Sequence, residues 1–177
     1  MEEWEILKKV MELRSEFRQS GGRSTKFVGA LTTEQMREKL IQKGFNVSRR
    51  DVFIEGVPYE MDLLVLREGE PSDCLLYKPE QVNAVLEVKF RGTYGKDAIK
   101  GIKRKFDAVK KVRADIKCLY VTLSENMKYK YRVTSKKLGY PVFELFTRDT
   151  PLERALKKKG IKTTGDWNKL IKLISGK

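Results

Sequence analysis

The chain has 177 residues and a formal charge of +14, from 38 basic and 24 acidic side chains. Its length suits one well-buried domain, and its 40% apolar content is that of a folded protein. A basic surplus attracts polyanions, most often nucleic acid. The sequence contains no histidine, which excludes Ser-His-Asp and Cys-His catalysis, imidazole-bound zinc, and nucleases whose general base is histidine.

The apolar segments are short. None approaches the roughly 20 residues that span a bilayer, and the N-terminus opens with acidic residues instead of a basic signal region. We therefore expect a soluble, cytoplasmic protein without a membrane partner. The two cysteines, Cys74 and Cys118, have neither disulfide nor zinc spacing, so we expect reduced structural thiols.

The N-terminal part predicts two helices. Apolar residues recur at helical spacing over 3–18, and Gly21-Gly22 ends that helix. A second helix is expected to begin at Thr32 or Thr33, as a capping hydroxyl, and to end near Gly44. Residues 1–31 are thus predicted to be an N-terminal helix and linker.

The middle of the chain predicts strands. Those at 45–54 and 59–67 should form a hairpin around a turn at 55–58. A polar loop at 68–81 then leads to a strand at 82–90.

The remaining chain alternates between helices and strands. The clearest element is an amphipathic helix at 96–112, whose apolar stripe includes Ile102 and Phe106. The later elements predicted are a strand at 116–123, a basic and partly helical segment at 124–138, a strand near a sheet edge at 140–146, and helices at 151–159 and 166–174. Together they predict an α/β fold with a mixed central sheet flanked by helices.

Ionised residues interrupt two strands that otherwise look buried. Strand alternation places Glu87 and Lys89 on the face opposite Val82, Ala84, Leu86, Val88 and Phe90. If the strand containing Asp62 is a neighbour, the three charged side chains converge. An unpaired buried carboxylate costs several kcal/mol. Two acids and one base leave a negative charge that a divalent cation would offset, and the alternative is a structural ion-pair network.

The predicted elements follow the order helix, hairpin, strand, basic helix, strand, and Asp62 is followed by Glu87-Val88-Lys89. This arrangement resembles the PD-(D/E)XK nuclease superfamily, also called restriction-endonuclease-like. The resemblance covers roughly 32–123, although Met61 stands where the family pattern has proline. It implies an αβββαβ nuclease core at 32–146, with 147–177 as a helical extension of the same domain.

The resemblance also implies roles for particular residues. Asp62, Glu87 and the Val88 carbonyl would bind Mg²⁺ or Mn²⁺, and Lys89 would orient or deprotonate the attacking water, helped by a lowered pKa. Archaeal junction resolvases add a glutamate from the first helix of the core, a place that Glu34 matches. Thr33 is the match if the register shifts by one, with Glu38 as the fallback. Glu60 could bind a second ion, anchor Lys89 or form a strand-end salt bridge.

The basic helix is the predicted nucleic-acid surface. The side chains expected to contact phosphates are Arg91, Lys96, Lys100, Lys103 and Arg104. The segment 124–137 would add a second positive face, and Tyr94 either stacks on a base or packs in its loop. Such side chains bind the phosphates of the nucleic acid and do not recognise its base sequence. The affinity should therefore fall steeply as the salt concentration rises.

These expectations describe a metal-dependent DNA endonuclease. The alternatives are a nucleic-acid-binding module that keeps a nuclease-like fold without cutting, and an RNA-processing nuclease. Because enzymes that cut both strands often pair as two-fold dimers, a homodimer is a further expectation. Either the first helix or the C-terminal helices would supply its interface.

Overall fold

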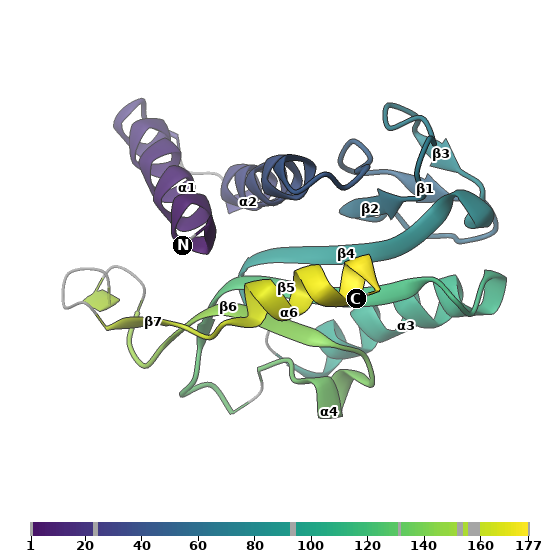
Figure 1. The fold of residues 1–177 in the computed structure, drawn as a ribbon. Helices are drawn as coiled ribbons and strands as arrows, with labels where there is room; N and C mark the ends of the chain where they lie inside the picture. Colours follow the sequence, from purple (N-terminus) through teal and green to yellow (C-terminus); the bar gives the residue numbers. More distant parts are fainter. Residues whose placement is uncertain are drawn as a thin grey trace.

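The computed structural model describes residues 2–22, 25–92, 95–130, 132–151, 154–155 and 160–176. Its centre is a five-stranded sheet in the order β2-β4-β5-β6-β7 (Figure 1). These strands are β2 (Leu63–Leu66), β4 (Val82–Arg91), β5 (Lys117–Asn126), β6 (Val142–Arg148) and β7 (Ile161–Thr163). The pairs β4-β5 and β5-β6 are parallel, whereas β2 and β7 lie antiparallel at the two edges. The expected α/β class with a mixed sheet is confirmed.

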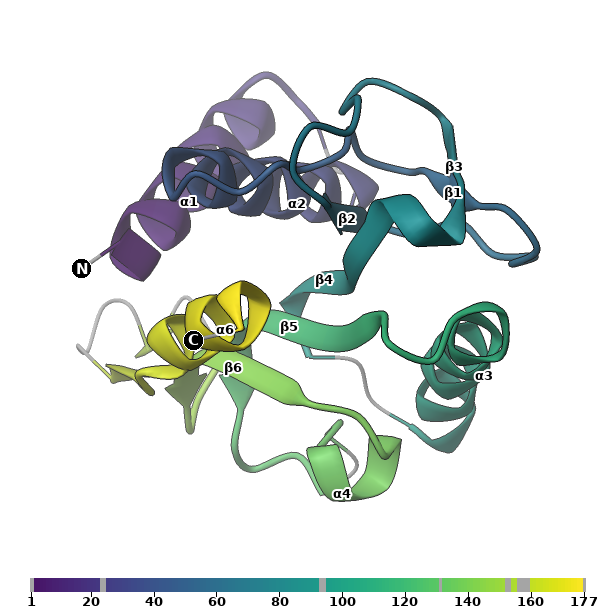
Figure 2. The ribbon, with the colours of Figure 1, turned by 45° about the vertical axis from the view of Figure 1, so that its right-hand side comes forward.

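Helices cover both faces of the sheet (Figure 2). One face packs against α1 (Glu2–Gln19), α2 (Thr25–Gln42) and α6 (Asp166–Ser175). The other packs against α3 (Lys96–Val112) and the short α4 (Ser135–Leu138). In the part of the chain that the structure describes, no helix has both the length and the apolar character needed to cross a membrane.

The apolar stripe of α3 packs as its spacing predicts. Ile102, Phe106 and Val109 are buried against the sheet, in one cluster with Val85 and Tyr120. Burying a large apolar side chain contributes about 1.5–3 kcal/mol. This packing fixes the side of the helix that faces β4, which matters for the site described below.

The second helix begins earlier than expected. It starts at Thr25, so Thr32 and Thr33 lie inside it, and their hydroxyls donate to the carbonyls of Val28 at 2.8 Å and Gly29 at 3.1 Å. Threonine can satisfy its hydroxyl on the preceding helical turn as well as at a helix start. The predicted start at Thr32 or Thr33 is therefore wrong, and part of the supposed linker is helical.

The predicted hairpin is mostly irregular. The expected strand at 45–54 contributes only β1 (Phe53–Ile54) and isolated bridges from Val47 and Val52 to the chain around β2. β1 pairs in parallel with β3 (Leu76–Tyr77), which lies in the predicted loop together with the 3-10 turn η1 (Pro79–Gln81). Asp51 has φ of 57°, a left-handed conformation that interrupts regular pairing here.

One further detail differs from the sequence pattern. Val82 shares a cluster with Val85 instead of Ala84, because the pairing of β2 with β4 shifts register between Val65 and Leu66. The prediction that the strand at 140–146 lies near a sheet edge is confirmed, because β6 is next to the edge strand β7.

The C-terminal helices agree with the sequence in part. The helix predicted at 166–174 is present as α6. Of the helix predicted at 151–159, residues 154–155 are helical, and 152–153 and 156–159 lie outside the described residues.

Candidate active site

The charged residues predicted to converge lie where β2 begins and β4 passes its midpoint. β2 runs antiparallel to β4, with Leu63 opposite Leu86. This register brings Asp62, directly before β2, beside Glu87. Because side chains alternate along β4, Glu87 and Lys89 point to the same face as each other. That face is the one covered by α3.

Lys89 contacts both of the predicted acids. The Lys89 Nζ atom lies 3.0 Å from Asp62 Oδ2 and 2.6 Å from Glu87 Oε1. Asp62 Oδ2 also accepts the Val88 N–H at 2.8 Å. The side chains of Asp62 and Lys89 are 20% and 33% exposed, whereas that of Glu87 is 6% exposed. The site is therefore partly open to solvent, and Glu87 is the most buried of its three side chains.

A fourth charged residue completes this site. Lys105, from α3, places Nζ 2.6 Å from Glu87 Oε2, and its side chain is only 18% exposed. Both Glu87 oxygens therefore contact ammonium groups. We call Asp62, Glu87, Lys89 and Lys105 the Asp62 cluster. With two acids and two bases it has no excess negative charge, which corrects the expectation that a cation is needed to compensate it.

The pKa values follow from this arrangement. Burial raises the pKa of Asp62, and nearby Glu87 raises it further, against the opposing effect of Lys89. Burial would also raise the pKa of Glu87, but Lys89 and Lys105 together hold it below the ordinary value. Burial alone would lower the pKa of Lys89, yet Glu87 and Asp62 outweigh it and raise that pKa. The expected lowering of the Lys89 pKa depends on a bound cation beside it and stays a prediction.

The other acids considered from the sequence have no contact with the Asp62 cluster among the described residues. The Glu34 carboxylate contacts Arg37 at 3.1 Å and Arg50 at 3.2 Å. Glu38 and Glu60 are exposed, and Glu38 accepts a bond from Gln35. Within the described residues, no group of three acidic or cysteine side chains is placed to hold a metal ion. The structure thus does not bring Glu34 or Glu38 to Asp62 and Glu87.

The predicted nucleic-acid contacts are exposed, as such contacts must be. They are Arg91 at the end of β4 and Lys96, Lys100, Lys103 and Arg104 on α3. Two of them have internal partners. The Arg91 guanidinium lies 5.8 Å from the centre of the Phe90 ring, and Lys103 contacts Asp107 at 3.0 Å. Tyr94 lies outside the described residues.

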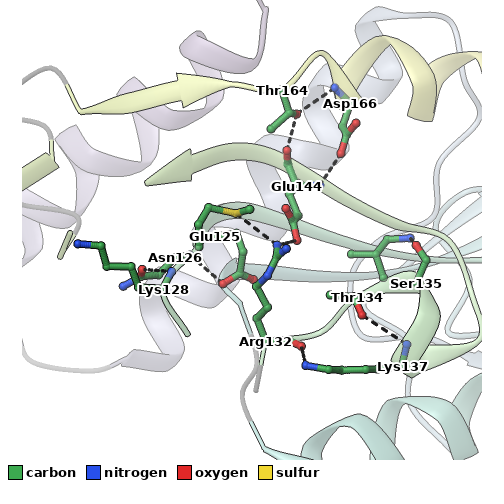
Figure 3. A network of polar contacts seen from close by, with 12 residues as sticks. Glu125, Asn126, Lys128, Arg132, Thr134, Ser135, Lys137, Glu144, Thr164 and Asp166 are labelled. Atoms are coloured by element: carbon green, nitrogen blue, oxygen red, sulfur yellow. Dashed lines mark hydrogen bonds and ion pairs between the residues drawn. The ribbon is translucent and has the colours of Figure 1, made fainter. Parts of the chain in front are cut away.

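The basic segment 124–137 is braced by a second polar network, between β5, β6 and α6 (Figure 3). Arg132 Nη1 donates to Glu144 Oε1 at 2.6 Å, and the Glu144 N–H donates to Asp166 Oδ2 at 3.0 Å. Burial raises the pKa of Glu144 despite Arg132. This network fixes the fold locally and leaves Lys128, Lys130 and Lys136 exposed.

Sequence reasoning did not single out Lys105 or the arginines around Glu34. Lys105 directly precedes the buried Phe106 and so lies at the border of the apolar stripe of α3. That position could have indicated that its side chain points towards the sheet. For the arginines, the signal was the dipeptide Arg49-Arg50 in a segment predicted to pair with the Asp62 strand.

Comparison with known proteins adds no identification. No model of a known protein family matches the chain, and no curated protein matches it by sequence. Functional inference therefore starts from the residues described above.

Proposed function

We propose that this protein is a metal-dependent nuclease that hydrolyses phosphodiester bonds, acting on DNA as an endonuclease. The observation that carries the proposal is the contact of Asp62 and Glu87 with a single ammonium group, that of Lys89, in a partly open site. Two acids and a lysine on adjacent strands, ahead of a basic helix, also form the pattern that resembles the PD-(D/E)XK superfamily.

The donor set suits a hard divalent cation. Mg²⁺ prefers oxygen ligands and usually keeps several waters while binding one or two carboxylates and a substrate phosphate. Asp62 and Glu87 offer those carboxylates, and the Val88 carbonyl is the third candidate ligand. Because both Glu87 oxygens contact lysines, a cation must compete with Lys89 or Lys105 for Glu87.

Each residue of the cluster then has a distinct role. Bound Mg²⁺ or Mn²⁺ would supply a water of lowered pKa and neutralise charge on the scissile phosphate. Lys89, which contacts both carboxylates, would donate a hydrogen bond and positive charge to the phosphate. Lys105, on α3, compensates the negative charge of Glu87.

Cleavage assays test this proposal. Supercoiled, nicked and branched DNA are incubated with Mg²⁺, Mn²⁺ or EDTA, using wild type, Asp62→Asn, Lys89→Met and the control Glu38→Gln, whose acid is exposed. We expect metal-dependent cleavage, a loss of roughly 10²–10³-fold in the two site variants, and none in the control. DNA and RNA of equal length, offered in competition, identify the preferred substrate. A wild-type protein that cuts neither with either metal would refute the proposal.

A second candidate function is a nucleic-acid-binding module that does not cut. The observation that favours it is the Lys105–Glu87 contact, which completes an internally balanced ion-pair network. This candidate predicts salt-dependent DNA binding with no cleavage under any metal, and binding that is unchanged by Lys89→Met.

A further inference from the structure

An open pocket of about 330 Å³ lies between α2 and the chain just before β1. The residues that line it, which we call the arginine pocket, are Glu34, Arg37, Arg49, Arg50 and Asp51. Three guanidinium groups and two carboxylates give it a net positive charge. Each guanidinium presents five N–H donors in a planar fork that matches the oxygens of a phosphate group.

Two of these arginines are held in place. Glu34 bridges them, with one oxygen 3.1 Å from Arg37 Nη1 and the other 3.2 Å from Arg50 Nε. Arg37 Nε also donates to the Ser48 carbonyl at 2.8 Å. These bonds use some of the donors on each guanidinium and leave others for a ligand. Side chains fixed in this way lose less conformational entropy on binding.

Arg49 differs from its neighbours. Its side chain is exposed, and among the described residues it has no hydrogen-bond or ion-pair partner. Its main-chain groups are both engaged: the N–H donates to the Ser72 carbonyl at 2.9 Å, and the Arg49 carbonyl accepts from the Ser48 hydroxyl at 2.6 Å. The backbone of Arg49 is therefore anchored while its guanidinium is available to an anion.

The arginine pocket is tied to the segment that carries Asp62. The Asp51 N–H donates to the Asp62 carbonyl at 3.3 Å, and Val52 and Met61 exchange both main-chain hydrogen bonds at 3.1 and 2.7 Å. Segments paired in this way lie about 5 Å apart. Asp51 itself has a left-handed conformation, with φ of 57°.

We infer that the arginine pocket is a phosphate-binding subsite, which holds a backbone phosphate of a nucleic acid close to the phosphate presented to the Asp62 cluster. The inference rests on the proposed function in taking nucleic acid as the ligand. Arg49 is the principal contact, with Arg37 and Arg50 beside it. Glu34 is a positioning residue that aligns two guanidinium groups and is not a metal ligand.

Binding measured in EDTA tests the inference separately from catalysis. The probe is a short fluorescent DNA duplex titrated over a range of salt concentrations. The variants are Arg49→Ala, Arg49→Lys and the control Arg113→Ala, a half-buried arginine paired with Asp115. Losing one phosphate contact should reduce the salt slope by about 0.9 in Arg49→Ala. The control should keep the wild-type slope, and the lysine variant should recover part of it.

Glu34→Gln distinguishes alignment from net charge. Removing a negative charge near a polyanion tightens binding if charge alone matters, whereas loss of alignment weakens it, and we expect weaker binding. An Arg49→Ala slope equal to that of wild type and control, or tighter binding by Glu34→Gln, would overturn the inference even if the protein cuts DNA. The expected binding changes in a protein that never cuts DNA would support the subsite and refute the nuclease.

Discussion

Replacing Lys105 by methionine removes one partner from the least exposed ion pair of the Asp62 cluster. The Glu87 and Lys105 side chains are 6% and 18% exposed, and their charged atoms are 2.6 Å apart. Breaking a buried pair costs about 3–5 kcal/mol when the remaining charge has no other partner. Here Glu87 keeps Lys89, so the loss should be closer to that of one charge-assisted hydrogen bond, about 2 kcal/mol. For a chain of this size that corresponds to roughly 4–8 °C in Tm.

Thermal and urea unfolding in EDTA measure this loss. The matched control is Lys103→Met, on the same helix, because Lys103 pairs with Asp107 at the surface with side chains 49% and 41% exposed. An exposed helical pair of this spacing contributes only about 0.3–0.5 kcal/mol. Equal losses in the two variants would refute the reasoning that Lys105 stabilises the fold through a buried partner.

The pH dependence provides a second check on the same variant. The pKa of Glu87 is lowered in the folded protein, so the fold favours its ionised form. This stabilisation is present above the ordinary value of 4.5 and is lost as the pH falls through the lowered value. The difference in stability between wild type and Lys105→Met should therefore shrink in acid. A constant difference would mean that Lys105 acts through some other group.

Two further predictions concern the core. Burial raises the pKa of Cys118 to about 12, so a thiol reagent should label Cys74 rapidly in the native protein and Cys118 only as the protein unfolds; rapid labelling of both would contradict this. A Cβ atom at Gly92 would lie 1.8 Å from Oε2 of the buried Glu125, so Gly92→Ala should lower the unfolding free energy by about 1–3 kcal/mol. A Gly101→Ala control, with nothing within 4 Å of the added atom, should not.

The sequence predicts the elements that have strong periodicity. The α3 helix has the same bounds as its predicted range of 96–112, and β4 extends one residue beyond its predicted end at 90. The contact of Asp62, Glu87 and Lys89 also follows from sequence, because strand alternation and the adjacency of two strands are enough to bring them together.

Other features depend on tertiary structure that no local pattern specifies. Which lysine of α3 reaches Glu87 depends on how the helix is rotated against the sheet. The two arginines bound to Glu34 come from α2 and from the irregular segment before β1, and Asp51 there adopts a conformation that strand propensity does not predict. β1, β3 and β7, of two or three residues each, are too short to show a recognisable pattern.

The irregular segment before β1 also covers the exposed edge of β2, the edge strand of the sheet. Main-chain groups of β2 and of the two residues before it are engaged by this segment, through the bonds of Leu66 to Asn46, Ser48 to Leu64, Asp51 to Asp62 and Val52 to Met61. An uncovered edge strand can pair with strands of other molecules, and such pairing leads to aggregation. Shortening this segment should therefore reduce solubility as well as remove Arg49 and Arg50. Any homologue that lacks the arginines would still have to keep a cover of similar length.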